Sequence, residues 1–406
     1  MLDFMDYVQH AFYAASHWNN DNFYGTLTAT NLALLDFTTP KGLRFNVSSL
    51  STPNSATSYT LSNRGVVDGS LSFLYSSIGL RVPSSSNTVN LKDWIRGYRY
   101  IAELRRSDEP SWWEIWQKGK RVDRKDALLY GRLYLPGSTL EGLYLRRISP
   151  TRTLRLSCVS DSMLPNGGAI LALLQNDYGK YSTEYLYSTD SSLLGVRGLY
   201  NFGRDPRKDA YEPGRDTFMP STTIDPSPIL GTTEPQHGRL SAGAEAYFSP
   251  INKSGGVSTA IRFTTLPSHT SFPYTMTLTV NPLMGNVSSG YAVKAGPDLS
   301  LCSRFDFNFY SYESDVQVGM ELWKRKHMDP ETAWARRMIR PDWQQGGAVP
   351  DDYDGVLKAK VDQNWKMSLL WEGRIKEVLV SFGAGLDLKK RDQIVGSVGL
   401  EFSYSS

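Results

Sequence analysis

Strict alternation of apolar and polar residues over long segments is the feature that most constrains the fold of this chain. Large apolar residues alternate with threonine over 274–280, and the same period of two runs through 299–309, 315–323 and 393–405. Successive side chains of a β-strand point to opposite faces, so this period predicts strands with one apolar and one polar face. The chain is therefore predicted to be all-β.

The lengths of the segments and of their connections select among all-β architectures, because a soluble sandwich alternates as well. The candidate strands run for roughly 9–11 residues, which is the length that a tilted strand needs to cross a bilayer and more than most soluble strands have. Several turns are very short, at 136–138, 149–150, 282–284 and 372–374. Sequential hairpins of such strands predict a transmembrane meander β-barrel, formed by residues 1–406 as a single domain.

About nineteen segments carry the strand pattern. They lie at 26–37, 42–49, 57–63, 67–77, 127–135, 138–147, 152–160, 168–176, 181–189, 193–203, 239–249, 256–266, 273–281, 284–294, 298–309, 313–324, 356–371, 374–387 and 393–405. Bacterial single-chain barrels have even strand numbers, whereas the mitochondrial anion channel has nineteen. An odd number forces the first and last strands to pair in parallel, and one missed strand would change the parity.

Three long connections, 78–126, 204–238 and 325–352, follow the fourth, tenth and sixteenth of these strands. All three follow even-numbered strands, so they are expected on one membrane face, with the C-terminus at the other. Within the first connection, residues 94–121 combine tryptophans with charged side chains. Helical pieces at the membrane interface or over the barrel mouth are expected there.

Residues 1–17 depart from the strand pattern. Leu2, Met5, Val8, Ala11 and Phe12 recur at helical spacing, which predicts a short N-terminal amphipathic helix. The helix could plug the lumen or lie on the membrane surface. Its polar face lacks the Lys and Arg that surface helices prefer, which favours the lumen.

Composition excludes several classes of protein. No stretch of about 18 apolar residues is present, so a transmembrane helix is excluded. The acidic segment 1–6 resembles neither a secretory signal nor a mitochondrial presequence. A balance of 44 basic against 41 acidic residues is too even to indicate nucleic-acid binding. The aromatic content of 12% suits a barrel with aromatic girdles at both membrane surfaces.

No catalytic, cofactor or metal site is predicted. The five histidines are scattered without an H-x-x-x-H pair, and no G-x-S-x-G motif occurs. Cys158 and Cys302 lie in strand-like segments without metal-ligand spacing, which is typical of inert thiols. A lipid-modifying barrel enzyme would need such residues, so the chain is expected not to be an enzyme.

The last strand carries a more specific pattern. Ser397, Gly399, Phe402 and Tyr404 give a polar residue, a glycine and two hydrophobic residues at alternate positions, which is similar to the mitochondrial β-signal. A glycine lets a second strand approach closely, as pairing with the edge of an insertase would require. An ordinary amphipathic strand is the alternative, and the position at the extreme C-terminus favours the signal.

Leu71, Phe73 and Tyr75 share the outward face of the strand over 67–77. Membership of an aromatic girdle is the simpler interpretation of these side chains. The functional alternative is a lateral docking surface for another membrane protein, formed by Phe73 and Tyr75.

A set of segments along the whole chain matches a known pattern, at 1–6, 11–13, 17–18, 28–30, 34–37, 51–54, 69–76, 278–285, 305–308 and 369–373. Together these segments resemble the fungal family of mitochondrial distribution and morphology protein 10. The resemblance implies a nineteen-strand barrel in the mitochondrial outer membrane, with the C-terminus towards the intermembrane space and the long connections in the cytosol. It also implies membership of the ER–mitochondria encounter structure, which supports phospholipid exchange, and of the sorting and assembly machinery, which aids biogenesis of the TOM complex.

Two classes of function follow from these expectations. The first is a non-enzymatic scaffold in the lipid bilayer that binds other subunits of the encounter structure and both the barrel and the peripheral subunits of the sorting and assembly machinery. The second is a pore that conducts ions or metabolites or translocates protein. The predicted lumen charges are mixed in sign, so no selectivity ring of a single sign is expected.

Overall fold

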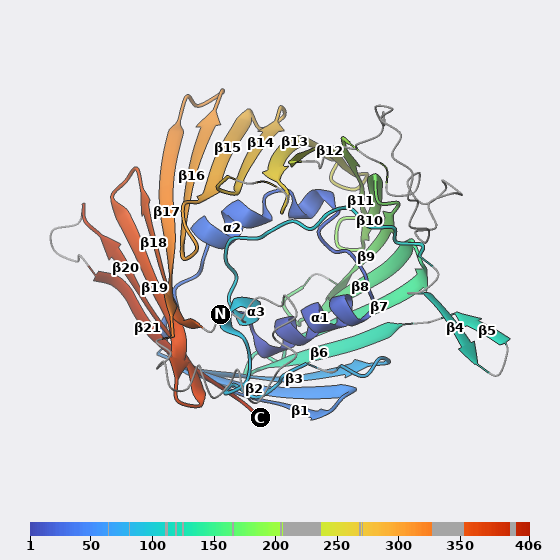
Figure 1. Cartoon of the computed structure of the whole chain (residues 1–406), viewed down its shortest axis with the longest axis horizontal. Coiled ribbons are helices and arrows are strands. Elements are labelled where there is room, and N and C mark those ends of the chain that lie inside the picture. Colours follow the sequence, from blue (N-terminus) through green and yellow to red (C-terminus); the bar gives the residue numbers. More distant parts are fainter. Residues whose placement is uncertain are drawn as a thin grey trace, which may run out of the picture.

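The barrel wall is a single closed sheet. The computed structural model describes residues 1–63, 65–80, 82–109, 113–117, 120–123, 126–164, 166–203, 205, 237–267, 269, 271–326, 353–389 and 395–406. Nineteen strands of this described chain pair edge to edge around an axis, with helices inside the ring (Figure 1). The predictions of an all-β barrel of nineteen strands and of an N-terminal helix are confirmed.

The wall strands follow the chain order around the ring. They are β1 (Gly42–Thr52), β2 (Ser55–Asn63), β3 (Val67–Ser76), β6 (Ala127–Leu135), β7 (Leu140–Ser149), β8 (Arg152–Ser160), β9 (Gly168–Asp177), β10 (Tyr181–Ser188), β11 (Leu193–Asn201), β12 (Gly238–Ser249), β13 (Ser254–Thr265), β14 (Tyr274–Asn281), β15 (Asn286–Lys294), β16 (Leu299–Asn308), β17 (Ser314–Arg325), β18 (Tyr353–Asp362), β19 (Lys366–Ile375), β20 (Val378–Asp387) and β21 (Val395–Ser405). Consecutive strands pair antiparallel, and β1 and β21 close the ring in parallel, from Gly42 opposite Gly399 to Ser48 opposite Ser405.

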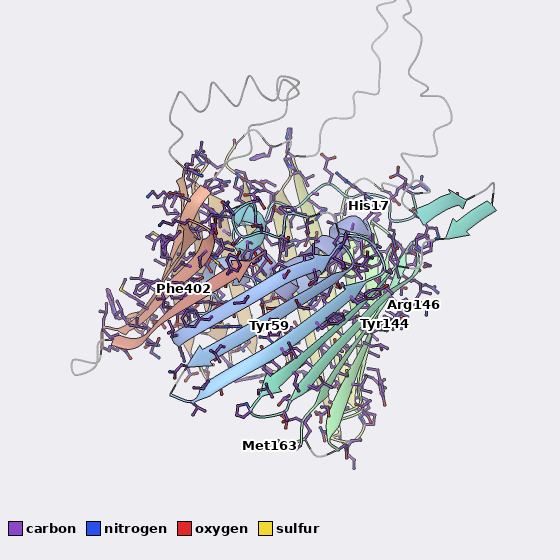
Figure 2. The ribbon with its side chains drawn as sticks, turned by 90° about the horizontal axis from the view of Figure 1, so that it is seen from below. His17, Tyr59, Tyr144, Arg146, Met163 and Phe402 are labelled. Carbon is purple, nitrogen blue, oxygen red and sulfur yellow. The ribbon has the colours of Figure 1, made fainter. Side chains whose placement is uncertain are left out.

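The alternation read from the sequence separates the two faces of the wall. On β3 the outward Leu71, Phe73 and Tyr75 are exposed, whereas Ser72 and Leu74 are buried towards the lumen. The strands run obliquely across the side of the barrel, as Figure 2 shows. An apolar outer face with internally paired backbone groups is the arrangement that hydrocarbon requires of a spanning sheet.

Two of the predicted strands are wrong. Residues 26–37 form no strand but the end of η1 (Tyr24–Thr26) and α2 (Ala29–Leu35), because Leu34 and Leu35 are buried inside the barrel. The predicted strand at 356–371 is in fact β18 and β19, joined by a turn at 363–365, and the predicted turn at 372–374 lies within β19. The false strand and the missed hairpin cancel, which leaves the number at nineteen.

The same two errors made the predicted placement of the C-terminus relative to the long connections wrong. The long connections 77–126, 202–237 and 326–352 follow the third, ninth and fifteenth wall strands, so all three begin at one end of the barrel, here called the loop face. No connection at the opposite end, the turn face, is longer than seven residues. The nineteenth strand also ends at the loop face, where Ser86 N donates to Ser405 O at 3.0 Å. The expectation that the C-terminus lies opposite the long connections is therefore wrong.

Non-barrel elements lie at the N-terminus and in the first long connection. The N-terminal helix α1 spans Phe4–Ala15. The tryptophan-rich segment gives one helical turn, α3 (Leu91–Trp94), and a hairpin, β4 (Glu114–Gln117) with β5 (Lys120–Asp123), where helical pieces were expected. The hairpin projects from the outside of the barrel (Figure 1). Within the described residues, no helix is both long and apolar enough to cross a membrane.

Candidate functional site

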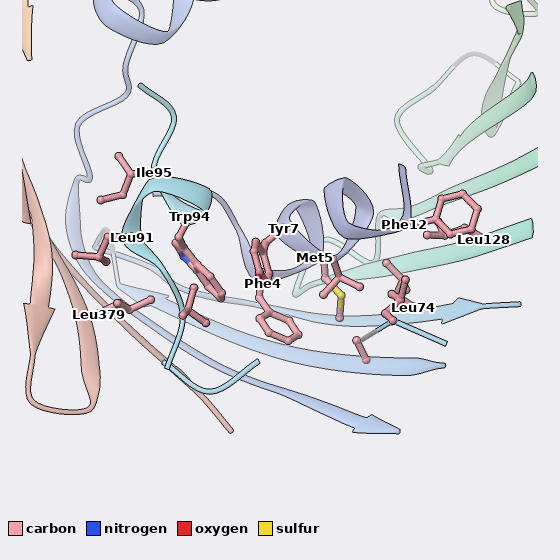
Figure 3. Close-up of a cluster of buried hydrophobic side chains, with 14 of the residues drawn as sticks. Phe4, Met5, Tyr7, Phe12, Leu74, Leu91, Trp94, Ile95, Leu128 and Leu379 are labelled. Carbon is pink, nitrogen blue, oxygen red and sulfur yellow. The ribbon is translucent and has the colours of Figure 1, made fainter. Parts of the chain in front are cut away.

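The structure places α1 inside the barrel, against the inner wall. Phe4 and Met5 are followed at intervals of three and four residues by Val8 and Phe12, so the four side chains share one helical face, and all four are buried. This face packs on a cluster that includes Leu74 of β3 and Leu128 of β6 (Figure 3). Burial of an apolar side chain of this size stabilises by roughly 1.5–3 kcal/mol. The helix is therefore fixed to the wall by apolar contact.

Ion pairs attach the polar side of this helix to its surroundings. Arg132 on β6 donates to Asp3 at 2.9 Å, and Arg96 donates to Asp6 at 3.2 Å. Burial raises the pKa of the Asp6 carboxyl, and the neighbouring Asp3 adds to the effect. The amino group of Met1 contacts Glu372 on β19. Both signs of charge thus face the space beside the helix.

The second helix, α2, packs on the opposite part of the wall, against β15, β16 and β17. Asn31 donates to Thr277 Oγ1 at 2.5 Å and lies directly over Gly290, where an added Cβ would be 1.9 Å from the Asn31 Nδ2. Leu35 lies similarly over Gly319, with 2.7 Å to an added Cβ. Glycine at these two wall positions is what lets α2 approach the sheet.

A third layer inside the wall is formed by residues 82–109 of the first long connection, here called the belt. Its backbone crosses the barrel mouth from the seam towards β9 and β10 (Figure 1). Trp94 of the belt is buried against Tyr7 of α1, with ring centroids 4.7 Å apart. The belt contacts the wall, in chain order, through Ser86 with Ser405, Val89 with Arg374, Arg96 with Lys358, Tyr98 with Thr275, Ala102 with Arg239 and Ser107 with Asp177.

The space left between helices, belt and wall is a cavity of about 1540 Å³. Acidic and basic side chains both line it, among them Asp36, Asp93, Arg44 and Arg132. Charges of both signs are therefore present in this cavity, although Glu401 is the only lining residue among the lumen charges read from the sequence (Arg155, Arg262, Arg304, Glu245, Asp306, Glu321 and Glu401). No group of three or more acidic, histidine or cysteine side chains suited to a metal ion occurs among the described residues.

The strand β21 holds the four residues of the β-signal pattern, and Gly399, Phe402 and Tyr404 lie in the seam that it forms with β1. Phe402 stacks on Phe45 of β1 with ring centroids 5.4 Å apart, and Tyr404 is exposed on the outer face. On the inner face, Asn46 donates to Glu401 at 2.6 Å and to Ser403 at 3.1 Å. The seam is thus joined by side chains on both faces as well as by the parallel ladder.

Gly399 has a second neighbour that the sequence did not reveal. The chain entering β1 passes over the inner face of β21, and an added Cβ on Gly399 would lie 2.3 Å from the carbonyl oxygen of Pro40. Gly383, opposite Gly399 on β20, lies under the ring of the same proline, and Ser397 lies one pleat before Gly399 on β21. In the folded barrel, Gly399 makes room for the segment 39–41 of this same chain.

Phe73 and Tyr75 lie on the outer wall, where they are 53% and 47% exposed. Their side chains are two residues apart on β3 and point away from α1, whose apolar face contacts the other side of the same strand. An exposed pair of this kind fits both an aromatic girdle and a docking surface, and the geometry leaves both interpretations open.

Comparison with known proteins gives the same family over the whole chain. The family model of mitochondrial distribution and morphology protein 10 matches residues 1–342 and 336–406. A protein of that name from Phaeosphaeria nodorum is 63% identical over 407 residues, and one from Sclerotinia sclerotiorum is 57% identical over 415 residues. The protein of that name from Podospora anserina is 40% identical over 458 residues. Each alignment covers 100% of both chains. The chain belongs to the family of mitochondrial distribution and morphology protein 10.

Proposed function

We propose that this chain is a non-enzymatic barrel of the mitochondrial outer membrane. In this role it anchors the ER–mitochondria tether, with its phospholipid exchange, and takes part in β-barrel sorting and assembly, including biogenesis of the TOM complex. Membership of a family named for mitochondrial distribution and morphology supports the mitochondrial role. A closed barrel with an apolar outer face supports the membrane location.

The filled lumen is the observation that favours a scaffold over a conduit. Two helices and the belt occupy the inside of the barrel, and their contacts reach β2, β3, β6, β9, β12 and β14 to β21. A pore would require these layers to move aside, and each has buried apolar or ionic contacts with the wall. A scaffold instead gains a rigid cylinder on which partners can be positioned.

A conducting pore is the second candidate, and the cavity of about 1540 Å³ favours it. Single-channel recording of the purified protein in a planar bilayer separates the two functions. A scaffold with its lumen filled should give no stable open level, whereas a pore should open at low voltage. A control preparation with residues 82–109 replaced by a short Gly-Ser linker shows whether the recording detects an emptied lumen.

The outer surface at Phe73 and Tyr75 is proposed to dock the sorting and assembly machinery. Aromatic side chains that anchor an interface can each cost about 2 kcal/mol or more when truncated. Replacing both residues with alanine should therefore lower co-purification with that machinery by orders of magnitude. Binding to encounter-structure subunits should remain, because the two complexes need not share this surface.

The chain offers a matched control five strands further around the wall. Tyr185 and Tyr187 on β10 are also two residues apart, outward and half exposed. Replacing both with alanine also removes two outward aromatic side chains but leaves β3 unchanged. Binding to the sorting and assembly machinery and to the encounter-structure subunits should therefore persist. Unchanged binding of the Phe73/Tyr75 variant would mean that these residues belong only to the aromatic girdle. Equal losses of binding in the two variants would indicate a general destabilisation of the barrel.

The orientation in the membrane is also part of this proposal. The resemblance implies a C-terminus towards the intermembrane space. Because β21 ends at the loop face, the three long connections then face the intermembrane space as well. The nine short connections of the turn face are left for the cytosolic side.

A further inference from the structure

Two arginines inside the barrel are almost completely buried at the loop-face end of β12 and β13. Arg262 is 2% exposed and donates from Nη1 to the carbonyl oxygen of Thr26 in η1 at 3.3 Å. Its Nε and Nη2 are buried and have no hydrogen-bond partner among the described residues. A guanidinium has five donors in a planar fork, so Arg262 leaves most of its donors unused.

Arg239 has the same character. It is 4% exposed, donates from Nη1 to the carbonyl oxygen of Ala102 in the belt at 3.2 Å, and has a buried Nε without a partner in the described structure. Ser241 lies opposite Arg262 in the strand register, so Arg239 is the diagonal neighbour of Arg262 on the same inward face. Diagonal pairs of this kind are within reach of long side chains. The two guanidinium groups therefore share one enclosed region between wall, η1 and belt.

The described carboxylates do not balance this charge. The acid that acts most strongly on both arginines is Asp21. Asp21 is already paired with Arg99 of the belt at 2.6 Å. The region thus combines three guanidinium groups with one carboxylate.

Such an arrangement is costly without a bound anion. Burying an unpaired charge costs several kcal/mol, and protein interiors normally supply a partner of opposite sign. The planar donors of arginine match the oxygens of phosphate in a bidentate geometry. Chloride could offset the charge, but it is a single spherical acceptor and cannot match two donors of one fork with two separate oxygens.

We propose that Arg239 and Arg262 form a binding site for an oxyanion of the phosphate class, held between the barrel wall, η1 and the belt. The anion accepts hydrogen bonds from the free donors of both guanidinium groups. Because the same two side chains hold the backbone of Thr26 and Ala102, the bound anion stabilises the attachment of the N-terminal segment and the belt to β12 and β13. The site is independent of the partner surfaces proposed above.

Thermal unfolding of the purified full-length protein in detergent tests this site. Inorganic phosphate is titrated at constant ionic strength against sodium chloride, and the unfolding midpoint is recorded. The wild-type midpoint should rise with phosphate and saturate, because a ligand that binds the folded state stabilises it by mass action. Arg262→Met should weaken phosphate binding by about tenfold to a hundredfold, the range for losing charged hydrogen bonds.

Arg304→Met is the matched control. Arg304 is also an inward wall arginine, but it is paired with Asp36 at 2.6 Å and with Asp306 at 3.1 Å. Its loss should lower the midpoint and leave the phosphate response unchanged. If Arg262→Met does not fold, the milder Arg239→Met and calorimetric titration of wild type with phosphate decide the question.

Three results would overturn the proposal. The first is a wild-type protein that does not distinguish phosphate from chloride. The second is an Arg262→Met or Arg239→Met protein with the full wild-type response. The third is an Arg262→Met protein that is more stable than wild type at every phosphate concentration, since the guanidinium would then be an uncompensated charge.

The source of the phosphate group is resolved by parallel titrations. Glycerol 3-phosphate represents a free small phosphate ester, and nanodiscs of phosphatidylcholine with or without phosphatidic acid present a lipid headgroup. Stabilisation by inorganic phosphate and glycerol 3-phosphate alone identifies a small-ion site. An additional response to phosphatidic acid that Arg262→Met abolishes identifies a headgroup site, and both results support an oxyanion at the two arginines.

Discussion

Gly399 is the position where one methyl group should do most damage to the closed barrel. An added Cβ would lie 2.3 Å from the carbonyl oxygen of Pro40, 2.4 Å from its carbonyl carbon and 2.6 Å from the nitrogen of Lys41. All three are backbone atoms, so no side-chain rotation relieves the contact. Gly399→Ala must therefore displace the segment 39–41 from the inner wall or widen the seam between β1 and β21.

The size of the effect follows from the balance of two terms. Overpacking a tight site costs typically about 1–3 kcal/mol, whereas glycine to alanine within a strand recovers roughly 0.5–1 kcal/mol. Because the opposing atoms are rigid backbone, the overpacking cost of Gly399→Ala should lie at the upper end of its range. The net loss in free energy of unfolding is then about 1–2 kcal/mol. Gly383→Ala should cost less, because its nearest contact is the ring of Pro40 at 2.5 Å rather than backbone.

Gly396→Ala on the same strand is the control. Its added Cβ would meet Gly385 O at 3.5 Å, an ordinary contact, so stability should change by less than about 0.5 kcal/mol or rise slightly. The assay is denaturant unfolding of protein refolded into detergent, which bypasses the insertion machinery. The loss of stability should be largest for Gly399→Ala, smaller for Gly383→Ala and smallest for Gly396→Ala. Equal midpoints for the first and last variants would refute this order and leave Gly399 a role in recognition alone.

Three further predictions rest on the geometry of wall and lumen. A C-terminal tag and the connection 77–126 should be cleaved together by protease added to one side of the membrane; cleavage of only one would contradict the shared face. Leu61→Arg on the outer face of β2 should cost more than the adjacent Thr60→Arg, because Thr60 lines the cavity. An arginine on a lipid face costs roughly 2–4 kcal/mol at the midplane and less towards the strand end, where Leu61 lies; equal losses would argue against a lipid-facing wall. The pKa of Asp6 is raised in the folded protein, so the folded protein binds the Asp6 proton more tightly than the unfolded chain does. The stability gained from this proton is therefore present below the unfolded-state pKa of Asp6 and lost as pH rises through its folded-state pKa. Asp6→Asn should accordingly raise the unfolding midpoint at pH 7 and leave it unchanged in strong acid, and a loss at pH 7 would show that the Arg96 pair outweighs burial.

The wall could be predicted from the sequence because a membrane-spanning strand must expose apolar residues at every second position. That rule located seventeen of the strands, but it could not separate a short apolar helix from a strand. The segment around Leu34 and Leu35 has the composition of both, and only burial against Gly319 inside the barrel decides for α2.

The missed hairpin has a different cause. Its turn at 363–365 contains neither glycine nor proline, the residues that usually mark a turn. Instead the Asp362 carboxylate accepts the backbone N–H groups of Asn364 and Lys366, at 3.0 and 2.8 Å, and Trp365 adopts a positive φ of 58°. A turn that is stabilised by a side-chain carboxylate needs no glycine or proline, so residue composition does not reveal it.

The lumen could not be predicted beyond the N-terminal helix. The belt has no periodicity of its own, because its backbone is held by wall side chains that lie far away in sequence. Of the four β-signal residues, the sequence indicated the glycine but not its contact with Pro40. The roles of Phe73 and Tyr75 as partner residues remain predictions, since their exposure fits either interpretation.

The closed seam and the belt add contacts of very long sequence separation to a wall that is otherwise built from sequential hairpins. Contacts inside the barrel join Met1 to Glu372, Asn46 to Glu401 and Ser86 to Ser405, so the first quarter of the chain is secured by the last. Loop-closure entropy delays contacts of such long sequence separation until late in folding. A chain that emerges in order can pack α1 on β2 and β3 early, but the contact of Met1 with Glu372 and the seam contacts form only once β19 to β21 are in place. Pairing of the last strands is then the step that fixes the N-terminus and the belt in place. Assembly of the barrel interior cannot finish before the end of the chain has folded.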